Sequence, residues 1–189
     1  MHGALMVVDM QNDFMDGGAL PVPGSLGVLP KVNEYVRAFS GRCLPVLFTR
    51  DWHPPDHISF ASRGGPWPPH CVRGTGGAGF HGLLDVPAGA TVISKAGERD
   101  GEAYSAFQGT RAAETLRGLS VRELYVCGVA TDYCVRQTVN DALSEGFLVF
   151  LLMDAVKGID DEGSKAAVDE MVRNGAVPLR MDGLLARLG

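Results

Sequence analysis

Short apolar runs alternate with stretches of helical periodicity along nearly the whole chain, and this alternation constrains the fold more than any other feature. The runs are almost continuously apolar, as in strands that are covered on both faces of a sheet. They are residues 4–8, 44–48, 91–94, 124–129, 147–153 and, more weakly, 176–179. Apolar residues recur at helical spacing in the segments 28–39, 112–119, 134–143 and 167–172. The pattern predicts an α/β fold with a mostly parallel sheet and helices on both faces.

Composition excludes several classes of protein. The length of 189 residues suits a single domain, so we expect one domain over residues 1–189. The longest apolar run, residues 147–153, is far shorter than the ~20 residues of a membrane span. A net charge of −5 without a basic stripe disfavours nucleic acid as a partner. Four cysteines without a C-x-x-C pair favour a reducing, cytoplasmic location.

Residues 51–90 break the alternation, because they are rich in proline and glycine and contain four of the five histidines. A carboxylate with two imidazoles suits Zn²⁺, Fe²⁺ or Mn²⁺ and leaves coordination positions open. Asp51 and His53 would point to the same side of an extended segment, so both could reach one ion. His57 and His70 compete for the third position, and spacing does not decide between them. A surface loop with solvated histidines is the alternative.

Cys134 follows the predicted strand 124–129 by one short turn and opens a helical pattern. With Thr131 or Asp132 as the N-cap, the cysteine would occupy the first helical turn. The helix dipole and the unpaired N–H groups there favour a thiolate and can bind an oxyanion. A cysteine that only packs the helix against the core is the alternative.

Asp9 and Lys95 directly follow the predicted strands 4–8 and 91–94. Ligand sites of open α/β sheets lie beyond the carboxyl ends of the strands, so we expect both residues at the same edge as Asp51 and Cys134. A lysine near a thiol lowers the pKa of the cysteine, and an acid beside it can take and return the proton. Acid, lysine and cysteine together make an activated nucleophile. A turn acid and a surface lysine are the alternatives.

Several segments resemble, in order, the motifs of the isochorismatase-like cysteine hydrolases. They are V-D-M-Q-N-D-F at residues 8–14, T-R-D-W-H-P at 49–54, G-P-W-P-P-H-C-V at 65–72, Lys95, Y-S-A-F at 104–107 and G-V-A-T-D-Y-C-V at 128–135. The D-W-H-P segment together with G-P-W-P-x-H-C-V is similar to the nicotinamidase (pyrazinamidase) members of that family. The resemblance extends from residue 4 to about residue 157.

The resemblance implies a three-layer α/β/α fold around a six-stranded parallel sheet of order 3-2-1-4-5-6. The implied site residues are the catalytic triad Asp9, Lys95 and Cys134, the metal ligands Asp51, His53 and His70, and the substrate-binding residues Phe14, Trp67 and Tyr104. His57 matches a position that is a ligand only in some members, so it is left out of the metal site. The family also has a non-proline cis peptide ahead of the nucleophile, here Val129–Ala130. That peptide would aim the backbone N–H groups of Ala130 and Cys134 at an oxyanion.

The implied activity is that of an amidohydrolase that converts nicotinamide to nicotinate and ammonia through a cysteine thioester, in NAD salvage. One divalent metal ion (Zn, Fe or Mn) is the implied cofactor, and a homo-oligomer is open because family members differ in assembly. A related carboxamide or an N-carbamoyl amine is the alternative substrate. A catalytically silent binding module is disfavoured, because all three triad residues are present. For segments 74–79 and 98–102, solvated loops are favoured over a mobile lid.

Overall fold

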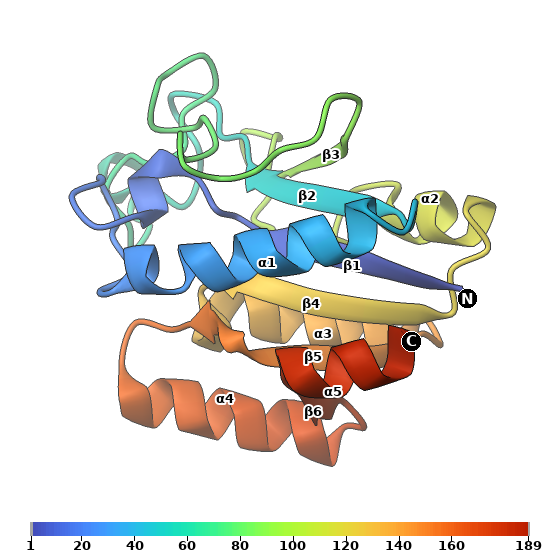
Figure 1. Cartoon of the computed structure of the whole chain (residues 1–189). Helices are drawn as coiled ribbons and strands as arrows, with labels where there is room; N and C mark the ends of the chain where they lie inside the picture. Colours follow the sequence, from blue (N-terminus) through green and yellow to red (C-terminus); the bar gives the residue numbers. More distant parts are fainter. Residues whose placement is uncertain (1, 189) are drawn as a thin grey trace.

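The structure, a computed structural model, describes residues 2–188 of the chain. Six parallel strands form one sheet in the order β3-β2-β1-β4-β5-β6, which confirms the expected order (Figure 1). The strands are β1 (Gly3–Val8), β2 (Val46–Asp51), β3 (Thr91–Lys95), β4 (Glu123–Val129), β5 (Leu148–Lys157) and β6 (Val177–Leu179). Each coincides, within a few residues at its ends, with one of the apolar runs. The hydrophobic pattern therefore predicts every strand of the sheet.

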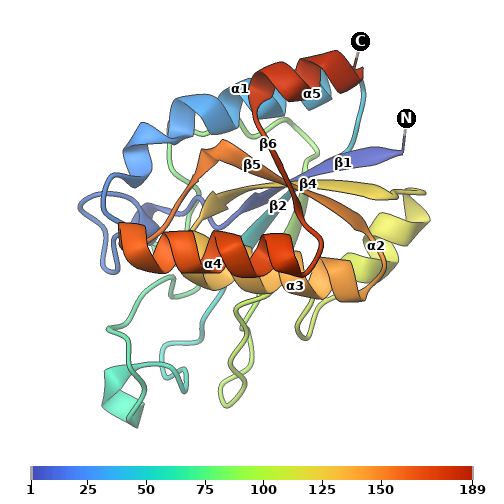
Figure 2. The same ribbon diagram turned by 90° about the horizontal axis from the view of Figure 1, so that it is seen from below.

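The helices form two layers, one on each face of the sheet (Figure 2). α1 (Leu29–Ser40) and α5 (Met181–Leu188) cover one face, and α2 (Ala112–Gly118), α3 (Arg136–Ser144) and α4 (Asp161–Arg173) cover the other. Four of them lie on the predicted helical segments. The sequence pattern did not predict α5, whose Leu184 is buried in the core on the α1 side. The three-layer α/β/α architecture is confirmed.

Two hydrophobic cores lie on opposite faces of this one sheet. Successive side chains of a strand point to opposite faces, so β1 contributes to both cores. Its Leu5 and Val7 pack on the α1 side, whereas Met6 and Val8 pack with the helices of the other face. The predicted burial on both faces is wrong for the edge strands, where Val92 of β3 and Val177 of β6 are 39% and 38% exposed. An edge strand has one neighbour only, and the helix layers cover its faces incompletely.

β1 and β4 approach each other closely at their carboxyl ends. Val8 pairs with Gly128, whose φ of 111° lies in the region that favours glycine. A Cβ atom at Gly128 would lie 2.1 Å from the carbonyl oxygen of Val8. This close approach brings Asp9, which follows β1, next to the turn that follows β4.

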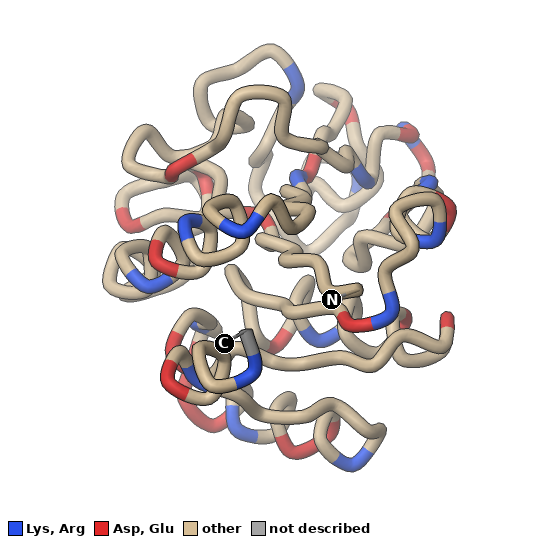
Figure 3. The backbone as a smooth tube through the Cα atoms, turned by 45° about the vertical axis from the view of Figure 1, so that its right-hand side comes forward, with Lys and Arg blue, Asp and Glu red and all other residues tan. Residues whose placement is uncertain are grey.

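The long connection between β2 and β3 lies beside the segment that follows β1 (Figure 1). The backbone N–H groups of Asn12 and Asp13 donate hydrogen bonds to the carbonyl oxygens of Gly79 and Gly77, at 2.9 and 3.1 Å. The 74–79 segment is therefore attached to the residues after β1. Charged residues of both signs are interspersed around the backbone (Figure 3). Between residues 2 and 188, no helix combines the length and the apolar character needed to cross a membrane.

Candidate active site

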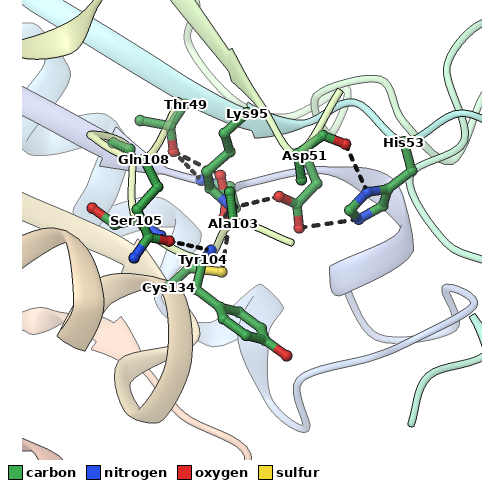
Figure 4. A network of polar contacts seen from close by, with 12 residues as sticks. Thr49, Asp51, His53, Lys95, Ala103, Tyr104, Ser105, Gln108 and Cys134 are labelled. Carbon is green, nitrogen blue, oxygen red and sulfur yellow. Dashed lines mark hydrogen bonds and ion pairs between the residues drawn. The ribbon is translucent and has the colours of Figure 1, made fainter. Parts of the chain in front are cut away.

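Four side chains that follow or end four neighbouring strands meet at the carboxyl edge of the sheet, as expected from the sequence. Figure 4 shows three of them, Asp51, Lys95 and Cys134. Lys95 Nζ lies 2.9 Å from Asp9 Oδ2 and 3.5 Å from Cys134 Sγ. It also donates a hydrogen bond to Asp51 Oδ1. One side-chain atom each of Asp9, Asp51 and Cys134 lies within 4.8 Å of the other two. The sulfur thus lies near a carboxylate and an ammonium group.

Asp9 is fully buried, and its two carboxylate oxygens have different surroundings. Oδ1 accepts a hydrogen bond of 2.6 Å from the hydroxyl of Thr49. Oδ2 contacts Lys95 as an ion pair but, within the described residues, accepts no hydrogen bond of regular geometry. Burial raises the pKa of Asp9 above its ordinary value, and the charge of Lys95 opposes this effect. Asp9 is therefore held through one oxygen, while the other is available to accept a proton.

Cys134 is 6% exposed and lies in a π-helical turn, Thr131–Val135, that leads into α3. The predicted N-cap by Thr131 or Asp132 is wrong, because Ala130 takes that position and makes no side-chain cap. The Asp132 carboxylate accepts hydrogen bonds from the backbone N–H of Ile159 instead, at 3.2 Å.

The expected ionisation of the Cys134 thiol is also wrong in its net direction. Burial raises the pKa of Cys134 well above its ordinary value, and the opposing charge of Lys95 does not outweigh it. The carboxylates of Asp9 and Asp51 add to the increase. The sulfur therefore rests as a thiol, and attack on a substrate requires a base to remove its proton. One carboxylate oxygen of Asp9 lies within 4.8 Å of the Cys134 sulfur, so Asp9 is the base beside it.

The peptide bond between Val129 and Ala130 is cis, as the resemblance implied. Both Ala130 and Cys134 line a cavity at this edge of the sheet. Among the described residues, the backbone N–H of Ala130 donates no hydrogen bond to another loop or turn. Backbone N–H groups beside the sulfur can bind a negatively charged oxygen.

A second group of residues that line this cavity is suited to a metal ion. One side-chain atom each of Asp51, His53 and His70 lies within 4.8 Å of the other two, and all three residues are buried. The Nδ1 atoms of His53 and His70 lie 3.2 and 2.8 Å from the carbonyl oxygens of Ala96 and Pro68. These contacts assign the proton to Nδ1 and leave Nε2 free as a ligand atom.

A second observation also indicates that these three residues are suited to a divalent ion. His53 Nε2 is buried without a hydrogen-bond partner among the described residues and lies 3.7 Å from Asp51 Oδ2. A buried nitrogen of this kind is costly unless something occupies it. One carboxylate and two imidazoles make a donor set for a first-row metal with open coordination positions.

His57 is placed differently, although the sequence made it a candidate ligand. Its Nδ1 lies 2.7 Å from Ser59 Oγ, and its Nε2 lies 2.9 Å from the carbonyl oxygen of Gly101. Both ring nitrogens are therefore engaged with the protein, and His57 is outside the metal-binding group.

Aromatic side chains form the walls of the cavity, whose empty volume, open side included, is about 480 Å³. The expected residues Phe14, Trp67 and Tyr104 all line it. Trp67 Nε1 donates a hydrogen bond of 3.0 Å to the hydroxyl of Tyr104. Tyr133 also lines the cavity, with its ring edge-on to Trp67 at a centroid distance of 5.4 Å. Such walls suit a flat ring.

Residues 3–182 match the sequence profile of the Isochorismatase domain. The chain belongs to the isochorismatase family. It is 41% identical to the nicotinamidase/pyrazinamidase of Mycobacterium tuberculosis, over 89% of this chain and 93% of the relative.

Two solved structures of the isochorismatase family agree closely with this fold. The pyrazinamidase of Pyrococcus horikoshii in complex with zinc is 55% identical, with a TM-score of 0.93 over 96% of this chain and all (100%) of that chain. The structure of PnC1 from L. infantum in complex with nicotinate is 37% identical, with a TM-score of 0.90 over 96% and 93% of the two chains. The resemblance stated from the motifs is confirmed.

Sequence reasoning missed Thr49 and Tyr133, described above, and two further residues of this isochorismatase-family site. Gln11 accepts a hydrogen bond from Asp51 N and donates one to Asp51 O, both at 2.8 Å, and donates another to Ala78 O at 2.9 Å. Its position two residues after Asp9 was the available signal. Phe60 packs against the rings of His53 and His70 at 5.5 and 5.6 Å, and no sequence spacing indicated that contact.

Proposed function

We propose that the protein is a nicotinamidase, which hydrolyses nicotinamide to nicotinate and ammonia in NAD salvage. One observation carries the proposal: a single cavity is lined by the Cys134 thiol, by the His53 and His70 imidazoles and by aromatic side chains. A flat heteroaromatic ring with a carboxamide substituent would place its amide at the sulfur and its ring nitrogen toward the imidazoles. The names of the relatives support the same substrate class.

The first half of the reaction forms a thioester. Asp9 Oδ2 takes the proton of the Cys134 thiol as the sulfur attacks the carboxamide carbon. The ammonium group of Lys95, 3.5 Å from the sulfur, stabilises the charge that develops there. The oxyanion of the tetrahedral intermediate accepts hydrogen bonds from the N–H groups of Ala130 and Cys134. Asp9 returns the proton to the amide nitrogen, the C–N bond breaks and ammonia leaves.

The second half of the reaction releases nicotinate. Asp9 accepts a proton from a water molecule, whose oxygen attacks the carbonyl carbon of the thioester. The same N–H groups bind the second oxyanion. The C–S bond breaks, the sulfur takes the proton back from Asp9, and the acid product dissociates. Atoms balance, because one water enters and one ammonia leaves.

Asp51, His53 and His70 would hold one divalent ion, for which we propose zinc, iron or manganese. Such an ion supplies a Lewis acid that a pyridine nitrogen or a water molecule can coordinate. Zinc is the first candidate, because the pyrazinamidase structure from Pyrococcus horikoshii is a zinc complex. Elemental analysis of the purified protein identifies the metal.

Phe14, Trp67 and Tyr104 would hold the pyridine ring of the substrate by offset and edge contacts. The assignment is tested by ammonia release from nicotinamide, pyrazinamide and acetamide at equal concentrations. We expect rapid release from the two heteroaromatic amides and little from acetamide. Faster release from acetamide, or from an N-carbamoyl amine, would overturn the assignment in favour of a related amidohydrolase.

We further propose a single domain over residues 1–189, since both hydrophobic cores share one sheet. A cytoplasmic location is supported by the cysteines, all four of which are free in the described part of the chain. Cell fractionation tests the location, and light scattering after gel filtration shows whether the protein forms a homo-oligomer.

A further inference from the structure

The buried ring of His57 contacts two nearby residues, Ser59 and His53, and one residue that is distant in sequence, Gly101. Its Nδ1 accepts or donates a hydrogen bond with the hydroxyl of Ser59, which lines the cavity. Its Nε2 is 2.9 Å from the carbonyl oxygen of Gly101, which lies 44 residues away along the chain. The ring also packs on that of His53, with centroids 4.2 Å apart. A carbonyl oxygen only accepts, so the proton of His57 belongs on Nε2 and Ser59 donates to Nδ1.

The carbonyl that His57 contacts belongs to residues 98–104, which we call the cover loop. Glu102 and Tyr104 of the cover loop line the cavity, and Tyr104 accepts the hydrogen bond from Trp67. The position of the cover loop therefore determines how closely the aromatic walls approach a bound ring.

The other attachments of the cover loop are mostly at the surface. Arg99 pairs with Asp56, and Arg63 pairs with Asp100 at 2.8 Å. Exposed ion pairs of this kind contribute little to stability. The backbone N–H of Ile58 also donates to the carbonyl oxygen of Arg99 at 2.9 Å. The contact from His57 differs from all of these, because a fully buried side chain makes it and a broken buried hydrogen bond is costly.

We propose that His57 is a positioning residue that fixes the cover loop against the cavity and so sets the affinity for substrate, rather than a fourth metal ligand. The inference rests on the proposed function. Both ring nitrogens of His57 have protein partners, which leaves neither one free for an ion, whereas His53 and His70 each keep one nitrogen without a partner among the described residues.

The test compares His57→Phe with the wild-type holoenzyme. Phenylalanine retains the ring contact with His53 and removes both hydrogen bonds. We expect KM for nicotinamide to rise about tenfold, kcat to change less than about threefold, and the metal content per chain to stay at the wild-type value. We also expect faster amide hydrogen exchange in residues 98–104. His57→Gln, which carries an N–H group at about the reach of Nε2, should restore part of the KM.

A matched control is His81→Phe, which removes a hydrogen bond outside the site that the backbone N–H of Leu83 donates to His81 Nδ1. It should leave KM, exchange in the cover loop and metal content unchanged. The proposal is overturned if His57→Phe loses its metal in proportion to its activity, or if KM and cover-loop exchange both stay at wild-type values. Absence of ammonia release by the wild type would instead contradict the proposed function, and exchange and metal content would still decide the role of His57.

Discussion

Two groups of functional residues, which we call the nucleophile end and the metal end of the site, are held by different means. At the nucleophile end, Asp9 and Lys95 lie at strand ends and form an ion pair, and Lys95 Nζ lies 3.5 Å from the Cys134 sulfur in the turn after β4. At the metal end, His53 and His70 come from the long connection after β2, and backbone carbonyl oxygens orient their rings. Asp51 belongs to both ends, because one of its oxygens contacts Lys95 and the other lies toward His53.

This difference shows which part of the site tolerates change. A buried group whose partner is charged cannot lose that partner without a large cost. An imidazole that a backbone carbonyl orients depends instead on the path of the loop. The residues that react with the substrate therefore lie at or just after the ends of the strands. The residues that bind the substrate ring lie in connecting segments, as is common in α/β enzymes.

The largest effect is expected from Cys134→Ala, which removes the nucleophile and leaves the metal end intact. We expect ammonia release from nicotinamide to fall by about 10⁴-fold or more, with an unchanged metal content. Steady-state assays and elemental analysis measure the two quantities. Cys43→Ala, at an exposed cysteine outside the cavity, is the control and should retain full activity. Substantial activity in Cys134→Ala would refute the thioester mechanism.

Removal of the metal ion tests the contribution of the metal end of the site. We expect kcat/KM for nicotinamide to fall about 10²-fold after chelation and to recover when zinc is added back. Benzamide has no ring nitrogen, so its slower hydrolysis should change much less. An equal loss for both amides would mean that the ion serves the nucleophile end as well, and that the division between the ends is wrong.

The pH dependence of kcat/KM reports on the nucleophile end. Asp9 must be ionised to accept a proton, and burial raises its pKa above the ordinary value of 3.8. As pH falls through this raised pKa, the rate should decline about tenfold per pH unit, starting from a higher pH than for an exposed aspartate. The profile is measured with the metal content checked at each pH. Undiminished activity at pH 4 with the metal retained is incompatible with Asp9 as the base.

The smallest effect is expected from Trp67→Phe, which keeps an aromatic wall and removes the hydrogen bond to Tyr104. KM should rise about fivefold while kcat stays nearly constant. Tyr104→Phe removes the same bond from the other side, so the double variant should show little additional change. Fully additive effects would show that this hydrogen bond does not position the wall.

Position along the strands predicted the nucleophile end well. Asp9 and Lys95 could be placed at one edge because the apolar runs before them end clearly and parallel strands share a carboxyl edge. The protonation state of Cys134 could not be predicted, since it depends on how many atoms from other strands cover the sulfur. Helix capping and the charge of a nearby lysine, which the sequence does indicate, favoured a lowered pKa for Cys134, which is the wrong direction.

The metal end was less accessible to sequence reasoning from the residues alone. The choice between His57 and His70 depends on Gly101 and Pro68, whose carbonyl oxygens engage one ring at Nε2 and the other at Nδ1. Contacts of this kind connect residues of irregular loops, and the spacing of residue types along the sequence does not predict them. The family motifs supplied what spacing did not, including the cis peptide at Val129–Ala130.

The close approach of Gly128 to Val8 indicates one way in which a mutation can abolish activity. The distance between Asp9 and Cys134 depends partly on Gly128, which takes no part in the reaction and has only a hydrogen atom as its side chain. Any side chain there would push β1 and β4 apart and increase the distance between Asp9 and Cys134, although no catalytic residue is replaced. Inactive variants of this protein should therefore include some that keep every catalytic residue but hold Asp9 and Cys134 too far apart to react.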